Sequence, residues 1–181
     1  HRGSKLTLYW DIFRDYIING STPSITLDYI PQCAFSTICR VIMVLLENGN
    51  TLSTDELSDK VGLTNSTLDN AMIDLVMFGL AKRESGKICL TVDSFNLGIE
   101  LLWDFFKRHI VYIIGQKELK SEFPYSDFKE LFVKIYREKM LNDKTKNVYS
   151  SKLFVWFVKL NFFSFEGSNY TFKTPEIDNI K

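Results

Sequence analysis

The sequence has few of the residues from which catalytic and metal sites are built. Among 181 residues there are two histidines, His1 and His109, and three cysteines. A zinc site needs several Cys or His ligands at short spacing, and the sequence has no such cluster. A Ser-His-Asp or Cys-His arrangement would have to use His109, for which a solvated helix position is the plainer interpretation. We therefore predict that the chain has no metal site, no catalytic nucleophile and no cofactor.

Phosphate loops and nuclease motifs are also missing. Gly79, Gly86 and Gly98 stand singly, so no glycine-rich loop is available to hold a nucleotide. Residues 118–120 have the Glu-x-Lys form found in one class of nucleases, but they lack the upstream Pro-Asp partner. An exposed charge pair is the simpler interpretation. These absences predict that this chain is not an enzyme, and they do not extend to any further part of a longer protein.

The cysteine and hydrophobic patterns indicate a compartment. Cys33, Cys39 and Cys89 are odd in number, lie among apolar residues and lack a CxxC spacing, which predicts buried free thiols in a reducing cytosol. No apolar run approaches the ~20 residues of a membrane span, and no signal peptide is visible. We expect a cytoplasmic protein, located at the nucleoid or in the nucleus if it binds DNA, without a membrane partner.

The formal charge is zero, so the molecule as a whole exerts no pull on DNA or on an anionic membrane. The charge is unevenly distributed, however. Between residues 134 and 159 there are seven Lys or Arg residues and only two acidic ones, Glu138 and Asp143. We expect any footprint for an anionic partner in this stretch.

The first thirty residues are predicted to stand apart from the main units. Residues 1–4 are typical of an affinity-tag remnant, which indicates a chain cut from something longer. Residues 5–30 hold a predicted helix over Leu6–Asn19 and a Pro-containing loop. This helix is expected to plug a core, with a dimer contact as the alternative. Its apolar face consists of Leu6, Tyr9, Trp10, Phe13, Tyr16 and Ile17.

Residues 31–92 carry the clearest pattern of local structure. An apolar helix covers residues 35–46, and Ser53-Thr-Asp-Glu56 has the spacing of a capping box for a short helix over 55–61. Gly62 stands where a left-handed C-cap residue belongs, and Thr64 opens another helix. Two β-prone runs then flank the Ser85-Gly86 turn, which predicts a hairpin.

This order of a helix, two short helices around a glycine turn, and a hairpin resembles the winged helix-turn-helix domain. The junction from Gly79-Leu80 into the basic hairpin is similar to the helix-to-wing junction of winged-helix regulators. The resemblance covers about a third of the chain and concerns types of residue instead of an invariant motif. It implies a mostly α fold with small β-hairpin wings.

Residues 93–174 are predicted to repeat the unit more loosely. A long helix over residues 95–115 serves as a linker helix or as the first helix of a second unit, and a helix over 126–140 follows Pro124. Ser150-Ser151 is expected to cap a last helix over 152–160, which precedes a second hairpin around residues 166–169. The resulting prediction is a tandem winged helix-turn-helix protein with a frayed tail at 175–181.

In a helix-turn-helix protein the second helix enters the DNA major groove, where basic and amide side chains contact the bases. Residues 64–80 contain no Lys or Arg, although Ser66, Thr67 and Asn70 offer hydrogen bonds near the helix start. Carboxylates in this helix would repel phosphates, so it is predicted to dock on either protein or DNA. The positions predicted to point outward are Thr67, Asp69, Asn70, Ile73, Asp74 and Met77.

The second unit offers more positive charge. Lysines surround the last predicted helix, and neutral donors lie at its predicted start, where a helix favours phosphate. The first wing adds three further cations. The predicted DNA-contacting residues of the second unit are Lys144, Lys146, Asn147, Tyr149, Ser150, Lys152 and Lys159, and those of the first wing are Lys82, Arg83 and Lys87.

We therefore expect a non-enzymatic module that binds double-stranded DNA, as the recognition part of a larger regulator or of a restriction or defence protein. The alternative is a protein-interaction module. Tandem winged-helix subunits of the kleisin-interacting type are similar in layout and tolerate a neutral charge and an acidic second helix. The partner would then be another protein or a second copy of the chain. A structural domain of a larger enzyme is a third interpretation.

Overall fold

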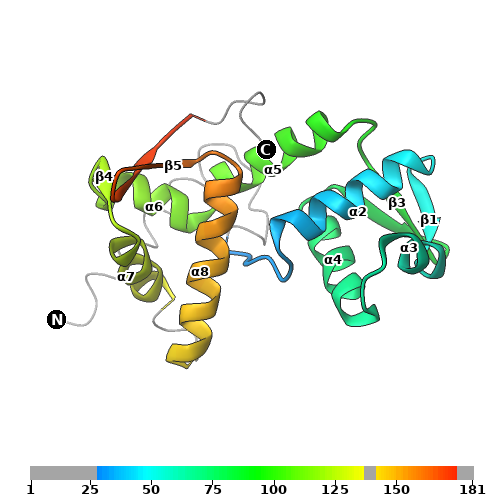
Figure 1. The fold of residues 1–181 in the computed structure, drawn as a ribbon, viewed down its shortest axis with the longest axis horizontal. Helices are drawn as coiled ribbons and strands as arrows, with labels where there is room; N and C mark the ends of the chain where they lie inside the picture. The colour runs from blue at the N-terminus through cyan, green and yellow to red at the C-terminus, as the bar shows by residue number, and fades with distance from the viewer. Residues whose placement is uncertain (1–27, 137–141, 175–181) are drawn as a thin grey trace, which may run out of the picture.

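The computed structural model describes residues 28–136 and 142–174. Within these residues the chain forms seven helices and six short strands, with the strands in two small antiparallel sheets (Figure 1). The predicted helix over Leu6–Asn19, the tag remnant and the predicted tail lie outside the described residues. No described helix has the length and hydrophobicity needed to cross a bilayer.

The first unit follows the predicted order and adds one strand. Its strands pair in the order β1-β3-β2, so that Leu52 of β1 lies opposite Ile88 of β3. The short β1 was not predicted from the sequence. The elements are α2 (Phe35–Glu47), β1 (Thr51–Ser53), α3 (Thr54–Val61), α4 (Asn65–Met77), β2 (Ala81–Glu84) and β3 (Lys87–Leu90).

Local signals in the sequence place these boundaries. The Ser53 side chain accepts from Glu56 N, and the Glu56 carboxylate accepts from Ser53 N at 2.8 Å, which confirms the capping box. Gly62 ends α3 at φ 63°, a conformation that costs glycine little. The Thr64 hydroxyl then accepts from Thr67 N and caps α4.

The second unit repeats this order behind α5, with strands paired as β4-β6-β5. The predicted long helix over 95–115 is wrong, because the chain breaks at His109, which caps α6. The last helix begins nine residues before the predicted start, with Asn142 as its cap in place of Ser150-Ser151. The elements are α5 (Phe95–Lys107), α6 (Ile110–Glu118), β4 (Glu122–Phe123), α7 (Tyr125–Ile135), α8 (Asp143–Lys159), β5 (Phe163–Glu166) and β6 (Asn169–Phe172).

The two units also match in the backbone that joins their last helix to their hairpin. Two hydrogen bonds after α4 recur after α8, and each partner in the second unit lies 82 positions after its counterpart. Gly79 and Asn161, which are related by the same shift, both have positive φ. The bonds join Leu80 N to Leu75 O and Thr91 N to Leu80 O in the first unit, and Phe162 N to Phe157 O and Lys173 N to Phe162 O in the second.

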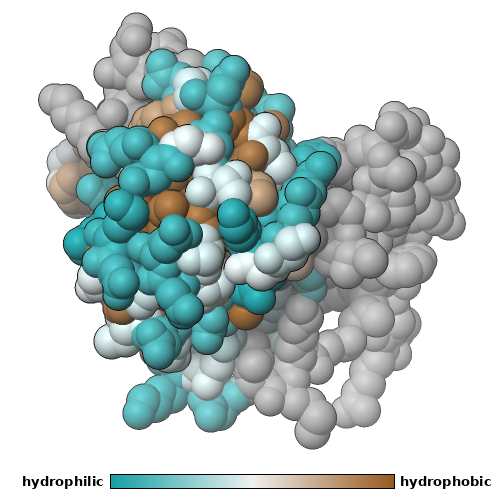
Figure 2. All heavy atoms as spheres, turned by 90° about the vertical axis from the view of Figure 1, so that its right-hand side faces the viewer, coloured by the Kyte–Doolittle hydropathy of each residue, from teal (hydrophilic) through white to brown (hydrophobic). Residues whose placement is uncertain are grey.

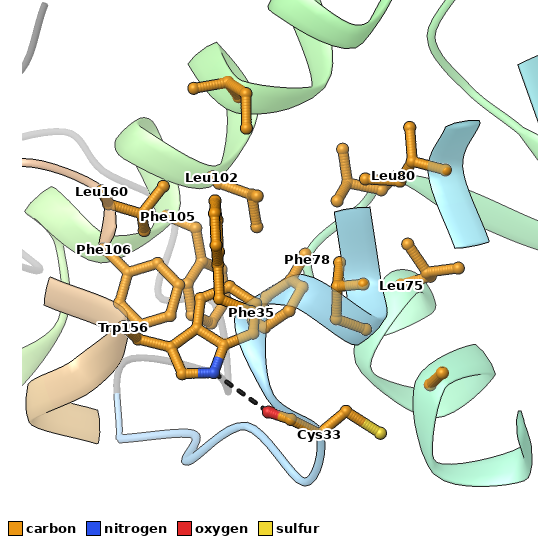
Figure 3. Close-up of a cluster of buried hydrophobic side chains, with 14 of the residues drawn as sticks. Cys33, Phe35, Leu75, Phe78, Leu80, Leu102, Phe105, Phe106, Trp156 and Leu160 are labelled. Atoms are coloured by element: carbon orange, nitrogen blue, oxygen red, sulfur yellow. Dashed lines mark hydrogen bonds between the residues drawn. The ribbon is translucent and has the colours of Figure 1, made fainter. Parts of the chain in front are cut away.

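The units share one continuous cluster of buried side chains. At its centre Trp156 of α8 is fully buried, and its Nε1–H donates to Cys33 O at 3.0 Å (Figure 3). The Trp156 ring centroid lies 5.2 Å from that of Phe35 and 5.3 Å from that of Phe78, both in the first unit. The last helix of the second unit is therefore packed into the core of the first.

Candidate functional site

Helix α4 precedes the first hairpin, and its exposed face carries no cation. Ser66 and Asp69 are exposed near its start, whereas Thr67 and Asn70 are half-buried. Further along, Ile73 and Val76 are 39% and 41% exposed although they are apolar. Leu68, Ala71, Met72 and Leu75 face the core, as predicted. The exposed face thus changes from polar to apolar along the helix.

The apolar end of α4 forms one wall of a groove, and strand β2 forms the other. The hollow has a volume of about 720 Å³. Lys82 and Arg83 of β2 lie at its edge beside Glu84. Its apolar lining consists of Ile73, Val76, Met77 and Ala81. Seen from the first-unit end, hydrophilic residues cover most of the surface, with apolar patches exposed between them (Figure 2).

The groove also borders a free sheet edge. Strand β2 pairs only with β3 in the described structure, and so its outer side carries backbone groups that are not bonded within the sheet. Such an edge can pair with an added strand. Apolar side chains next to open backbone groups therefore suit a peptide segment as the occupant.

Asp74, predicted to point outward, is fully buried. Its Oδ1 accepts from Tyr29 Oη at 2.5 Å and from Gln32 N at 2.9 Å, and its Oδ2 accepts from Cys33 N at 2.7 Å. Burial raises the pKa of the Asp74 carboxyl, although the three donors act in the opposite direction. This carboxylate, which was expected to repel DNA phosphates, instead anchors the segment of residues 28–34.

Segment 28–34 is held from both units. Asp74 and Trp156, which are related by the 82-residue shift, both bind the backbone of Cys33: Asp74 accepts from its N–H and Trp156 donates to its C=O. Tyr136 Oη donates to Asp28 O at 2.9 Å. The segment therefore links α4 of the first unit to α8 of the second through its backbone, and both helices contribute to the same core.

The predicted DNA-contacting lysines of α8 differ in exposure and in their partners. Lys144 and Lys159 are exposed, but the Lys146 side chain is only 13% exposed and lies 3.8 Å from Asp143. Lys152 Nζ donates to Gln32 O at 2.6 Å, which ties it to segment 28–34. Two of the four lysines are therefore engaged within the protein.

The neutral donors predicted beside these lysines lie within α8, not at its start. Ser150 is fully buried and its hydroxyl donates to Asn147 O, so the prediction that it contacts DNA is wrong. Tyr149 is half-buried. Asn147 and Ser151 are exposed. The first turns of α8 project beyond the neighbouring helices (Figure 1).

The wing of the first unit keeps its cations in solvent. Lys82, Arg83 and Lys87 are all exposed on the β2–β3 hairpin. Glu84 lies among them and is also exposed, and it pairs across the hairpin with Lys87 in the strand register. The wing therefore offers a weak positive field rather than a dense basic patch.

His109 occupies a structural position in the core, and the prediction of a solvated residue is wrong. It is fully buried, its Nδ1 accepts from Val111 N at 3.3 Å, and Nε2 lies 3.0 Å from Tyr29 O. A backbone donor at Nδ1 places the proton on Nε2, which then donates to the carbonyl. Glu118 pairs with Lys134 and not with Lys120.

The remaining reactive side chains are dispersed as well. All three cysteines are free, as predicted, but only Cys33 is buried, whereas Cys39 and Cys89 are half-buried. Burial raises the pKa of the Cys33 thiol to about 11 and that of Cys39 to about 12. The described residues contain no group of three His, Cys, Asp or Glu side chains able to hold a metal ion.

Comparisons with known proteins assign no family to this chain. No protein-family model, no curated protein and no solved structure matches the chain.

Proposed function

We propose that the chain is a non-enzymatic module of two winged helix-turn-helix units, and that it binds a protein partner through the groove between α4 and β2. The repeated element order and the repeated strand order support the tandem assignment. In both units the middle strand of the sheet is the last one of the hairpin, and the helix before the hairpin is the one that a winged-helix protein presents to its ligand.

The single observation that carries the protein partner is the character of α4. A DNA-reading helix presents Arg, Lys, Asn or Gln to the bases and gains affinity by releasing counterions from phosphates. Helix α4 presents Asp69 and then two exposed apolar side chains, Ile73 and Val76. Apolar side chains gain free energy only when a partner removes them from water, at roughly 25 cal/mol per Å² of apolar surface. Residues of this kind favour protein over DNA.

The layout agrees with this choice. Tandem winged-helix subunits of the kleisin-interacting type bind protein segments and tolerate a neutral charge, and this chain has a formal charge of zero. The free edge of β2 and the apolar wall of α4 would together take an extended or helical segment. Lys82 and Arg83 at the edge favour a segment with acidic residues.

Double-stranded DNA is the second candidate, and α8 is the element that favours it. Lys144, Asn147 and Ser151 are exposed within the first nine residues of α8. One lysine and two neutral hydrogen-bonding side chains would make few phosphate contacts, so binding would be weak and steeply dependent on salt.

A photo-crosslinking residue at Val76 of the full chain, used in extract from the cells that express it, tests the first candidate. We expect one protein to be captured, and Ile73→Glu to abolish its capture. Leu97→Glu is the matched control, because Leu97 is also a 39% exposed apolar residue and lies on α5, outside the groove. Equal loss with both variants would refute the groove as the binding site.

A titration with a short DNA duplex at two salt concentrations separates the candidates. The protein-binding proposal predicts that Lys144→Glu does not weaken any binding to the duplex. Salt-dependent binding that Lys144→Glu abolishes and Ile73→Glu leaves unchanged would replace the first candidate by the second.

A further inference from the structure

A second groove lies between α2 and α8, and the proposed function does not use it. Its volume is about 520 Å³. Two apolar side chains along it are strongly exposed, Met43 of α2 at 50% and Val155 of α8 at 47%. Ala34, the last residue of segment 28–34, lies at the groove. The rest of its apolar lining is Phe35, Cys39, Val44 and Phe95.

We propose that this groove binds residues 6–19 of the same chain as an amphipathic helix. The sequence of this stretch repeats apolar residues at helical spacing, with Tyr9, Trp10 and Phe13 at the centre of the apolar face. Such a face must be covered, because an exposed stripe of aromatic side chains in water is unfavourable. The groove offers apolar surface from two helices to cover it.

The dimensions of the two parts agree. Thirteen residues of α2 form a helix about 20 Å long, and fourteen residues over 6–19 would form one about 21 Å long. Residues 20–27, if extended, span up to about 28 Å, which is more than the length of α2. Asp28 lies six residue steps, at most about 22 Å, from Ala34 at the groove, so residues 20–27 are long enough for residues 6–19 to reach it without displacing segment 28–34.

The charges also agree in sign. The groove carries Arg40 and Lys159 with one carboxylate, Glu47. Residues 6–19 carry Asp11 and Asp15 with one guanidinium, Arg14. A groove with an excess of positive charge thus faces a segment with an excess of negative charge, which favours the bound arrangement in water by a modest amount. The apolar contacts supply most of the affinity.

Hydrogen exchange followed by mass spectrometry on the full chain tests the proposal. We expect amides of residues 6–19 to exchange at least about tenfold more slowly in the wild type than in Val155→Glu or Met43→Glu, because a charged side chain in the groove would displace the helix. Val148→Glu is the matched control: it makes the same change on α8 at a valine of similar exposure, 51%, away from the groove. It should leave the protection unchanged.

Three results would overturn the proposal. One is rapid exchange of residues 6–19 in the wild type. Another is an equal effect of Val155→Glu and Val148→Glu. The third is protection that increases with protein concentration together with a dimer mass in light scattering, which would assign the groove to a second copy. Protection of α4 is followed in every variant, and Met43→Glu decides the outcome if Val155→Glu also loosens α4.

Discussion

Replacing Asp74 with alanine should detach segment 28–34 from α4 and destabilise the protein without touching its surface. Asp74 is fully buried and accepts three hydrogen bonds, two of them from backbone N–H groups. In Asp74→Ala the buried N–H of Cys33 loses its acceptor. An unpaired buried donor costs about 1–3 kcal/mol.

The other two donors contribute less, because water can replace their acceptor. Tyr29 is half-buried and Gln32 is exposed, and each lost bond of this kind costs about 0.5–1.5 kcal/mol. Removing a carboxylate whose pKa is raised by burial returns part of this free energy. The net loss should be about 2–4 kcal/mol, a large part of the roughly 5–15 kcal/mol that stabilises a domain.

The assay is urea unfolding followed by circular dichroism at neutral pH. Asp69→Ala is the matched control, since Asp69 is an exposed aspartate on the same helix and should change the free energy of unfolding by less than about 0.5 kcal/mol. Asp74→Asn should restore little of the lost free energy of unfolding, because its NH₂ group would face one of the N–H donors and could not accept a hydrogen bond from it. A loss below about 1 kcal/mol in Asp74→Ala would refute the role of this carboxylate as an anchor.

Three further predictions concern the core. Trp156→Phe removes the donor to Cys33 O and part of a fully buried ring, so calorimetry should show a loss of about 2–4 kcal/mol; an unchanged melting temperature would contradict this. Asn161→Gly should stabilise the protein by about 0.5–1 kcal/mol in urea unfolding, because Asn161 has φ 59° and its buried Nδ2 has no hydrogen-bond partner among the described residues; a loss of stability would count against the equivalence with Gly79. Folding raises the pKa of the Cys33 thiol from 9.0 to about 11 and that of Cys39 to about 12, so above pH 9 the folded state keeps protons that the unfolded chain releases. The free energy of unfolding should therefore have its full value below pH 9 and fall as the pH rises from 9 to 12. Cys39→Ala should make this fall less steep, and an unchanged slope would refute the reasoning.

Some features could be predicted because their signals are local. The Ser53–Glu56 capping box, the helix end at Gly62 and the Ser85-Gly86 turn of the hairpin each depend on residues no more than four positions apart. Side-chain and backbone preferences act directly over that distance. The order of elements in the first unit was therefore readable from the chain.

Other features escaped prediction because their partners are distant in sequence. Strand β1 has only three residues and is defined by pairing with β3, with Leu52 opposite Ile88. Asp74 reads as a surface carboxylate on a helical wheel, yet its partners lie 41 to 45 positions earlier. Its place on the polar side of the helical wheel gave no local signal that it is buried.

The α8 boundary shows a different limit. Asn142 and Ser150 are both good cap residues, so the local rule allowed either start. The structure has Asn142 as the cap, and Ser150 lies inside the helix on its buried side, where its hydroxyl donates to Asn147 O. The break at His109 has a similar origin, because its ring bonds to the carbonyl of Tyr29, eighty positions earlier.

By itself, the sequence determined the order of helices in the first unit, the caps at Ser53 and Thr64, and both hairpins, since these depend on preferences that act over a few residues. The tertiary structure decided which faces of α4 and α8 stay open to a partner. That choice depends on the hydrogen bonds that Asp74 and Trp156 make to the backbone of Cys33, and on burial in a core common to both units. Contacts between residues so far apart in the chain leave no periodic pattern in the sequence.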